Sequence, residues 1–404
     1  MTGSNSRRSV LRSAVAVGGI ALSATAVSAG DAAAVAAAAD AGWVNVKDHG
    51  AKGDGATDDT VALQAALDAC QPGNVTVLPA GVYRTSAPLR IGPYVTLQGS
   101  HAGGEGQPGA RNPVVGIRPL PSFTGNAVVE ILDQQLGGYS VQANAQRIFS
   151  LSIDGSDLPR DGAEIDGIRA TGQIQHLQLR DVHVRAVTGI GINTWYNFNA
   201  TGGPQAPFCL HYDRVSVLWT GSHGIVLNNS TDSVFHDVYV LGVGGCGWWM
   251  SGAGNSSFTS CRAEWSALHG FDIESVPGVI KMVACSTDRN GWNGMYVHAT
   301  DTTGVLLLSA TNLTRDGKNK GAGGGGYAGL GVAGSQCKVM ADGLVVLTGK
   351  DDDGTGVASP QYGVRADNSA YVVVNSGHLQ GVSSPWRDGT GNTKFVKGTL
   401  VGVG

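Results

Sequence analysis

Apolar and polar residues alternate along short stretches of this chain, and each stretch begins at a glycine. The stretches include "DGIRAT", "HGIVLNN", "CGWWMSG", "HGFDIES" and "NGMYVHA". Alternation with a period of two predicts β-strands that bury one face. The repeat glycines are Gly167, Gly189, Gly224, Gly247, Gly270, Gly294, Gly329 and Gly363. They lie 22, 35, 23, 23, 24, 35 and 34 residues apart, so the basic period is about 23 residues.

A second strand pattern recurs within each period, as in "HLQLRDVHV", "SVFHDVYVL" and "VIKMVACST". A unit this short cannot bury its own apolar face, so successive units must stack on one another. The Leu/Asn spacing of a leucine-rich repeat is absent from the sequence. The pattern therefore predicts an all-β fold, a single-stranded right-handed parallel β-helix.

A different period is found near the start of the folded region. After "HGAKGDGATDD" comes "TVALQAALDAC", with apolar residues at Val61, Leu63, Ala66 and Leu67. This is helical spacing. Thr57, Asp58 or Asp59 can accept hydrogen bonds from the first-turn N–H groups. We therefore expect a capping α-helix that covers the N-terminal end of the solenoid, and we favour this over a metal site at Asp54, Asp58 and Asp59.

The first 41 residues differ from the rest. A twin arginine, Arg7-Arg8, precedes a short apolar stretch and small residues suited to cleavage. This arrangement is typical of a signal peptide of the twin-arginine route. We therefore interpret residues 1–41 as a signal peptide with a low-complexity lead-in and residues 42–404 as one β-helix domain, and we expect a secreted protein.

Composition agrees with many short strands and tight turns. The chain has 62 glycines and only 14% charged residues. Its net charge of −4 gives no electrostatic argument for nucleic acid or an anionic membrane as a partner, and no later apolar run is long enough to span a bilayer. The six cysteines form no CxxC pair, so zinc is not expected. Most of them are expected to be buried thiols, although export would permit disulfides.

The outward face of the repeats carries the candidate chemistry. Residues one and three positions after each repeat glycine are apolar and should face the core, so those at two and four positions should face outward. Asp272, Glu274, Tyr296 and His298 then form a two-by-two block on adjacent rungs, with Trp249 one rung below. We expect Asp272 to lie against Tyr296 and Glu274 against His298.

Two carboxylates on one groove suggest acid–base chemistry. The strand spacing predicts a separation near the about 6.5–9.5 Å of an inverting glycosidase, and Trp249 offers a flat face for a sugar ring. The alternative is that this face is merely polar. Further substrate-binding candidates are Asn228, His269, Arg289 and Arg365. Asp351 to Asp353 are interpreted as a solvated loop, with calcium as the alternative, and no metal is expected in the groove.

Two segments resemble known families. "VKDHGAKGDGATDDTVALQAALDAC", followed by "VTVLPAGVYRTSAPLRI" and "VTLQGS", resembles the N-terminal signature of the pectate-lyase-like superfamily over residues 44–100. That superfamily includes polygalacturonase-related hydrolases, rhamnogalacturonase-like and epimerase-like enzymes, and phage tailspikes. "HGFDIES" resembles both the polygalacturonase strand N-T-D-G-F-D and the alginate C5-epimerase motif Y-G-F-D-P-H. In the second motif Asp272 matches the catalytic Asp, whereas His269 and Glu274 replace Tyr and His.

Three functions remain open from the sequence. The first is a polysaccharide-cleaving glycoside hydrolase with Asp272 and Glu274 as acid and base and no cofactor. The second is a lyase or C5-epimerase of a uronic acid polymer, with His298 or Tyr296 as base or acid and Arg289 neutralising the uronate. The third is a non-catalytic, tailspike-like glycan-binding protein. The protein is expected to be a monomer or a homotrimer.

Overall fold

The computed structural model describes residues 42–102, 115–132, 134–136, 139–141, 143–195, 206–298, 304–319, 326–350, 358–368, 370–389 and 395–400. Contacts within the chain divide it into Met1–Ala41 and Gly42–Gly404. The predicted signal peptide and the acidic run at 351–353 lie outside the described residues. All of the described residues belong to the second unit.

One sheet has 11 strands, and its spatial order is the order of the strands along the chain. Its strands are β5 (Leu89–Arg90), β8 (Ala127–Leu132), β13 (Asp166–Thr171), β16 (Ile192–Trp195), β18 (Ile225–Asn228), β20 (Trp248–Ser251), β23 (Phe271–Ser275), β26 (Met295–Val297), β29 (Ala328–Ala333), β32 (Tyr362–Asp367) and β34 (Ser384–Asp388). Neighbouring strands in it are parallel. We call it the groove sheet.

The remaining large sheet has 20 strands and forms the other sides of the coil. Its strands are β1 (Trp43–Asn45), β2 (Asp54–Asp58), β3 (Val75–Leu78), β4 (Gly81–Thr85), β6 (Thr96–Gly99), β7 (Val115–Pro119), β12 (Arg147–Asp154), β15 (Gln178–Arg185), β17 (His211–Leu218), β19 (Val234–Leu241), β21 (Ser257–Thr259), β22 (Arg262–Glu264), β24 (Val279–Val283), β25 (Ser286–Asp288), β27 (Val305–Ser309), β28 (Asn312–Thr314), β30 (Lys338–Asp342), β31 (Leu344–Leu347), β33 (Tyr371–Leu379) and β35 (Phe395–Leu400). Two small sheets pair β9 (Gln134–Leu136) with β10 (Tyr139–Val141) and β11 (Ala143–Asn144) with β14 (Ile174–Gln175).

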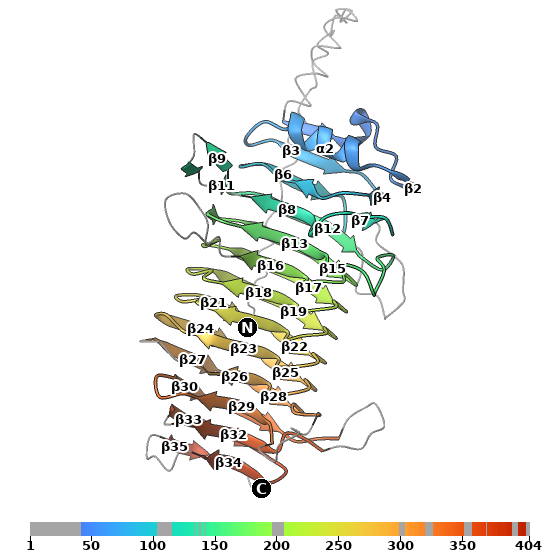
Figure 1. Cartoon of the computed structure of the whole chain (residues 1–404). Helices are drawn as coiled ribbons and strands as arrows, with labels where there is room; N and C mark the ends of the chain where they lie inside the picture. Colours follow the sequence, from blue (N-terminus) through green and yellow to red (C-terminus); the bar gives the residue numbers. More distant parts are fainter. Residues whose placement is uncertain are drawn as a thin grey trace, which may run out of the picture. The chain divides into compact units, whose positions relative to one another are not determined.

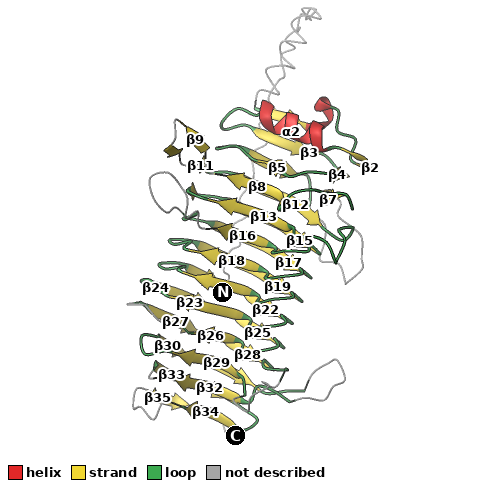
Figure 2. Cartoon of the chain, in the orientation of Figure 1, coloured by secondary structure: helices red, strands yellow, loops and turns green. Residues whose placement is uncertain are grey.

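Figures 1 and 2 show the strands stacked rung upon rung, with the colour of Figure 1 changing steadily along the stack. Sequential strands that pair in parallel require a crossover between them, and here each crossover is one turn of the coil. The predicted parallel β-helix is therefore confirmed.

Residues in the left-handed backbone conformation make the bends of the coil. One series separates the two halves of the larger sheet in each rung and includes Arg214, Asp237, Ser260, Ala284 and Ala310. A second series follows the second half and includes Trp219, Trp265, Arg289 and Arg315. Single residues of this kind are tolerated at turns, where they redirect the chain. Each rung is thus bent at matching places, which keeps successive strands in register.

The repeat glycines are required by the close approach of neighbouring rungs. A Cβ atom on Gly224 would lie 2.6 Å from the carbonyl oxygen of Gly247, and one on Gly247 would lie 2.6 Å from that of Gly270. One on Gly270 would lie 2.5 Å from the carbonyl oxygen of Gly294. Real Cβ atoms do not come this close to oxygen, so only glycine fits at the start of these strands.

The core beneath the candidate site is a column of aromatic rings. Phe235 and Phe258 stack with ring centroids 4.6 Å apart, and Trp248 stacks on Phe271 at 5.8 Å. The predicted inward residues of these rungs, among them Met250 and Ile273, are fully buried. The outward residues of the same strands therefore project from a closely packed support.

The helix α2 (Thr60–Ala69) packs at the N-terminal end of the coil, beside β5, β1 and the short 3-10 helix η1 (Val46–His49). The predicted cap is confirmed, and Leu63, Ala66 and Leu67 are buried in its contact. Val61 was predicted in the buried stripe, and this was wrong because it is 83% exposed.

The acidic residues before α2 stabilise turns. Asp59 occupies the N-cap position without a side-chain cap bond, because its carboxylate accepts hydrogen bonds from the backbone N–H of Lys52 and Gly53. Asp58 accepts one from the backbone N–H of Thr60, in the first turn of the helix. Asp54 accepts hydrogen bonds from Ala56 and Thr57, which lower its pKa to about 2.

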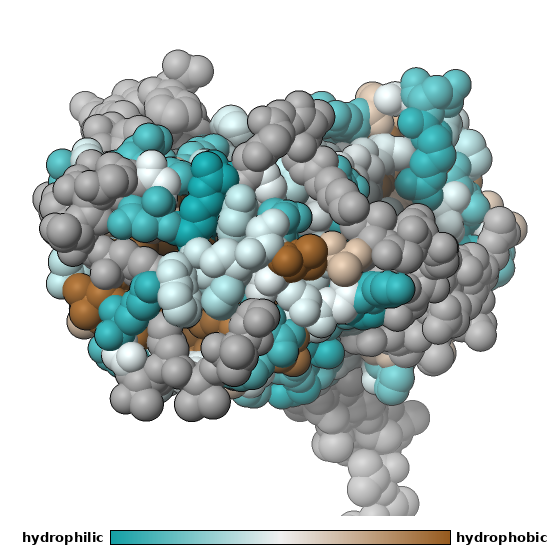
Figure 3. Space-filling view, turned by 90° about the horizontal axis from the view of Figure 1, so that it is seen from below, coloured by the Kyte–Doolittle hydropathy of each residue, from teal (hydrophilic) through white to brown (hydrophobic). Residues whose placement is uncertain are grey.

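The six cysteines are free thiols, five of them buried and Cys209 partly exposed. Within the described part of the chain, no helix has the length and apolar character needed to cross a bilayer. Seen from below in Figure 3, hydrophilic residues predominate and hydrophobic ones occur in small patches.

Candidate active site in the groove

The outward positions of the groove sheet form a continuous column. In register from rung to rung are Glu130, Arg169, Asn193, Val226, Trp249, Asp272, Tyr296, Gly331, Arg365 and Arg387. One predicted position was wrong. Gly191, rather than Gly189, begins β16, because Ile192 pairs with Ile168 and Ile225. The correct register places Trp195 at the end of β16, where it is 42% exposed and offers an aromatic face that the sequence pattern did not predict.

Asp272 and His298 form the central contact of the site. The Nε2 atom of His298 lies 2.8 Å from Oδ1 of Asp272, which is on the neighbouring rung. Asp272 pairs in register with Tyr296 as predicted, but His298 contacts Asp272 rather than Glu274. Since the carboxylate accepts, Nε2 carries a proton, and in the neutral imidazole Nδ1 is the basic nitrogen.

A β-bulge explains why Glu274 does not reach His298. Met250 pairs with Ile273 and Ser251 with Ser275, so Glu274 is an extra residue in β23. Bulges reorient side chains and are common beside active sites. Here the Glu274 carboxylate turns to the preceding rung, where it accepts a hydrogen bond of 2.9 Å from the indole Nε1 of Trp249.

The predicted spacing of the carboxylates is wrong as a consequence. One ligand atom from each of Asp272, Glu274 and His298 lies within 4.8 Å of the others. This is shorter than the about 6.5–9.5 Å that leaves room for an attacking water in an inverting glycosidase. Among the described residues these three are the group that could hold a cation.

Tyr296 lies between two histidine rings. Its ring stacks on His269 with centroids 4.7 Å apart and on His298 with centroids 4.6 Å apart, and in both pairs the ring planes are nearly parallel, at 16°. Burial raises the pKa of Tyr296, so its phenol stays protonated near neutral pH. Three groups able to transfer protons are thus gathered on two rungs.

The contact between Asp272 and His298 shifts the pKa of both groups. The hydrogen bond from His298 to Asp272 raises the pKa of the imidazole despite partial burial. Burial alone would raise the pKa of Asp272, but the hydrogen bond from His298 and the nearby imidazoles hold it below its usual value. The thiol of Cys246 lies beneath, 3.5 Å from Oδ2 of Asp272. Burial, with the Asp272 charge, raises the pKa of this thiol, so it remains a neutral donor.

His269 has a structural partner. Its Nδ1 accepts a hydrogen bond from the backbone N–H of Asn293, in the next rung. Burial lowers the pKa of His269 to about 4, so the ring is neutral and carries its proton on Nε2. His223 accepts from the N–H of Cys246 in the same way, and the Asn293 amide oxygen accepts from that of Ala328. At these three positions the residue before the repeat glycine is therefore a support between rungs, and His269 also lines the pocket beside Tyr296.

Two other predicted binding residues differ in their accessibility. Arg365 lies on the groove column, where its Nε donates to Asp367 and its Nη1 donates to the Gly326 carbonyl at 2.8 Å. Asn228 is also on the groove sheet, but it is only 8% exposed and its amide oxygen accepts a 3.4 Å hydrogen bond from Asn229. Its prediction as a substrate-binding residue is wrong for this reason.

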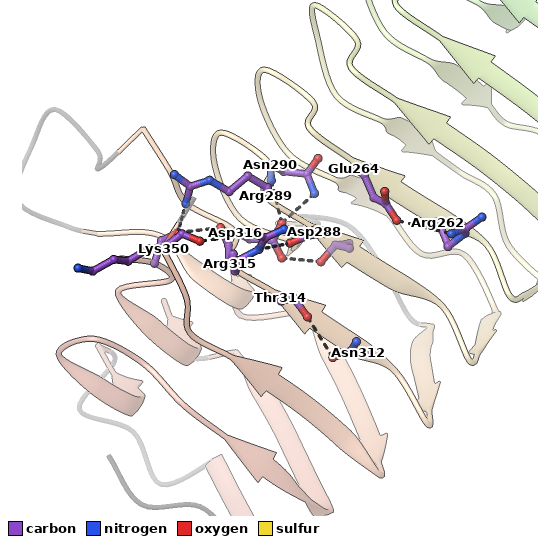
Figure 4. A network of polar contacts seen from close by, with 12 residues as sticks. Arg262, Glu264, Asp288, Arg289, Asn290, Asn312, Thr314, Arg315, Asp316 and Lys350 are labelled. Carbon is purple, nitrogen blue, oxygen red and sulfur yellow. Dashed lines mark hydrogen bonds and ion pairs between the residues drawn. The ribbon is translucent and has the colours of Figure 1, made fainter. Parts of the chain in front are cut away.

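Arg289 was also predicted at the site, and the structure contradicts this. It stands at a left-handed bend after β25, not on the groove sheet, and it is fully buried. Its Nη1 donates to Ser359 at 3.0 Å. Figure 4 shows it within a polar network that also includes Asn290, Asp316 and Arg315. Burial in this network leaves Arg289 out of reach of a substrate in the groove.

Known protein families and curated proteins are similar to parts of this chain. Residues 43–119 match the family described as rhamnogalacturonase A/epimerase, pectate lyase-like. The chain is 35% identical to alginate lyase 7 of Azotobacter vinelandii over 150 residues, which are 35% of this chain and 16% of that protein. It is 31% identical to mannuronan C5-epimerase AlgE3 of the same organism over 166 residues, which are 37% of this chain and 8% of that protein. The chain thus spans a small part of the length of these curated relatives.

The fold has a close counterpart of its own size. The A-module of mannuronan C5-epimerase AlgE6 from Azotobacter vinelandii superposes with a TM-score of 0.61, covering 89% of this chain and 99% of the module at 18% identity. The match at residues 43–119 and this shared architecture confirm the resemblance of the chain to the pectate-lyase-like superfamily of parallel β-helix proteins.

Proposed function

We propose that this protein acts on a uronic acid polymer by moving a proton at C5, as a polysaccharide lyase or a C5-epimerase. The observation that carries the proposal is the Asp272–His298 pair with Tyr296 stacked against the imidazole. The relatives named for alginate lyase and mannuronan C5-epimerase support a uronate rather than a neutral sugar. They shift the preference away from the hydrolase that the paired carboxylates first suggested.

His298 is assigned the role of base. Its Nε2–H donates to Asp272, so Nδ1 is the atom that takes the C5 proton. Asp272 orients the ring and stabilises the imidazolium that forms, which is the role a carboxylate plays beside a catalytic histidine. The imidazole is 31% exposed, so Nδ1 is accessible from the groove.

Tyr296 is assigned the role of acid. Its raised pKa keeps the phenol protonated until it is needed. In a lyase, the phenol protonates O4 as the C4–O4 bond breaks and a C4–C5 double bond forms. In an epimerase, it returns a proton to C5 on the face opposite to the one deprotonated. No cofactor enters either scheme.

The glycoside hydrolase remains the second candidate, because Asp272 and Glu274 bring two carboxylates into one cluster. In that case Glu274, held by the Trp249 indole, would share acid–base work with Asp272. The carboxyl groups of retaining enzymes are about 5–5.5 Å apart. This separation is closer to the spacing in the Asp272–Glu274–His298 cluster than the about 6.5–9.5 Å of inverting enzymes.

One experiment separates the candidates. The mature protein is incubated with alginate, polygalacturonate and neutral polysaccharides, and three signals are followed: reducing ends, ultraviolet absorbance of unsaturated uronates, and uronate epimer composition by NMR. New ends with absorbance indicate elimination, and a changed epimer ratio without new ends indicates epimerisation. New ends without absorbance would favour the hydrolase and overturn our proposal. Binding with no product would leave the tailspike-like alternative.

A further inference from the structure

The groove continues past Tyr296 into a pocket that the chemistry above does not use. The pocket has a volume of about 220 Å³ and lies between the Tyr296 rung and the Arg365 rung. At about 30 Å³ per water molecule, it would hold several waters or a group the size of a sugar ring. Tyr296 is shared by the pocket and the proposed active site.

The floor of the pocket is a glycine on the outward column. Gly331 pairs with Tyr296 on one side and Arg365 on the other. A Cβ atom on Gly331 would lie 3.1 Å from both Tyr296 and Asn293, so a larger residue would fill the space. The absence of a side chain at this one position therefore opens the groove next to the proton-transfer groups.

One wall of the pocket is aromatic. Trp292 and Tyr327 stack with centroids 5.8 Å apart at 16°, and both line the pocket. Flat aromatic faces with a few convergent polar groups are typical of small-ligand sites. The wall suits the apolar face of a pyranose ring.

The far side of the pocket carries charged side chains, and a further arginine lies on the next rung. Arg365 and Arg387 are directly opposite one another on β32 and β34. Arg365 forms an ion pair with Asp367, and both side chains line the pocket. Asp367 receives a hydrogen bond from Arg365, and the Arg387 guanidinium donates to the Tyr362 hydroxyl at 3.2 Å. Each guanidinium group is thus held by a protein contact, Arg365 in the pocket lining and Arg387 one rung further on.

We infer that the pocket over Gly331, with Arg365 and Arg387 beyond it, is a subsite that binds a uronate residue of the polymer through its carboxylate. This rests on the proposed function and names the groups that select an acidic sugar. Arg365 lies one rung beyond Gly331, so a sugar in the pocket adjoins the sugar that reacts at His298 and Tyr296. Guanidinium groups bind carboxylates with strong, directional hydrogen bonds.

The test measures binding separately from turnover. Oligosaccharides from alginate and polygalacturonate, and the same oligosaccharides with reduced carboxyl groups, are titrated calorimetrically into full-length protein carrying His298→Gln, which prevents consumption of the ligand. Arg365→Gln and Arg387→Gln are added singly. Arg180→Gln is the matched control, because Arg180 lies on β15 in the other sheet with its side chain 51% exposed.

We expect Arg365→Gln to weaken binding of the acidic oligosaccharides about 10- to 100-fold, the value of a charge-assisted hydrogen bond, and Arg180→Gln to leave it unchanged. Carboxyl-reduced oligosaccharides should bind weakly to every variant. Gly331→Val, which keeps both arginines, should also weaken binding by filling the pocket. Unchanged affinity in Arg365→Gln, or equal affinity for the carboxyl-reduced ligand, would overturn the subsite.

The two proposals can fail separately. Uronate binding that depends on Arg365, without any product from the wild-type protein, would support the subsite and reject the proposed function. Product formation by the wild type, with unchanged KM in Arg365→Gln, would support the function and reject the subsite. Failure of all the acidic oligosaccharides to bind would overturn the subsite regardless of the turnover result.

Discussion

The Nε2 atom of His298 lies 2.8 Å from Oδ1 of Asp272, across two adjacent rungs of the groove sheet. The residues are 26 apart in sequence, and only the stacking of one turn of the coil on the next brings them together. A contact of this kind depends on the register of the two strands. It is the relationship on which the proposed chemistry rests.

Replacing His298 by Gln should abolish most activity while leaving the fold intact. A general base contributes about 100- to 10,000-fold to the rate, so kcat on the responding polyuronate should fall within that range with little change in KM. The matched control is His236→Gln, because His236 also contacts an aspartate, Asp213 at 2.8 Å, but on the other sheet. Equal losses in both variants would indicate a general effect on structure and contradict the assignment.

Tyr296→Phe removes only the phenol oxygen and keeps the ring between His269 and His298. We expect kcat to fall by about 100-fold or more, with the melting temperature close to that of the wild type. Tyr239→Phe serves as the comparison, since Tyr239 donates to Glu264 at 3.0 Å outside the groove sheet. Full activity in Tyr296→Phe would exclude the phenol as the acid.

The pH dependence of kcat/KM should report the Asp272–His298 pair. The base must be neutral to act, and the hydrogen bond to Asp272 raises the pKa of His298 above its ordinary value of 6.5. Activity should therefore fall with decreasing pH below that raised pKa. In Asp272→Asn the residual activity should show this acidic limb at lower pH. An acidic limb that does not move would show that another group is the base.

The repeat glycines give a stability prediction. Gly247→Ala should lower the free energy of unfolding by about 1–3 kcal/mol, because its Cβ atom would lie 2.6 Å from the carbonyl oxygen of Gly270 and force the rungs apart. Gly92→Ala is the control, since the nearest atom to its Cβ is at 4.0 Å. Urea unfolding of the two variants measures the difference, and similar values would contradict the steric account.

The buried Asp316 predicts a pH-dependent stability. Burial raises its pKa to about 7 from 3.8, although Thr287 and Asn290 donate to it. A group with a raised folded-state pKa stabilises the fold at low pH, and this contribution is lost as pH rises through about 7. The free energy of unfolding of the wild type should thus decline between about pH 4 and pH 7. The decline is at most about 1.4 kcal/mol for each unit by which folding raises the pKa of Asp316. Asp316→Asn should flatten this slope, whatever its effect at a single pH.

The repeating part of the fold could be predicted because each period is dictated locally. Alternation identifies the strands, and a glycine marks each point where two backbones nearly touch. The same logic placed Asp272 opposite Tyr296, since both follow their glycine by two residues. It misplaced Gly189, because two glycines two residues apart look alike until pairing selects Gly191.

The contacts within the site could not be predicted in the same way. Glu274 is displaced by a bulge, and a bulge adds a residue without changing the alternating pattern enough to reveal itself. Arg289 looked available because it precedes a turn that could rim the site, but a left-handed bend carries it into the interior, where Ser359 receives its hydrogen bond. Both errors arise from long-range geometry that a single repeat does not contain.

At four of the rungs, the residue before the repeat glycine tolerates different chemical groups. His223, His269 and Asn293 each accept a hydrogen bond from one backbone N–H of the next rung along the chain, and Asp166 accepts that of Ile190 in the same manner. An imidazole, an amide and a carboxylate therefore meet the same scaffold requirement. A related protein could therefore carry a different one of these side chains at such a position and still keep the hydrogen bond between rungs. The chemical groups beside the groove can thus change while the β-helix is preserved.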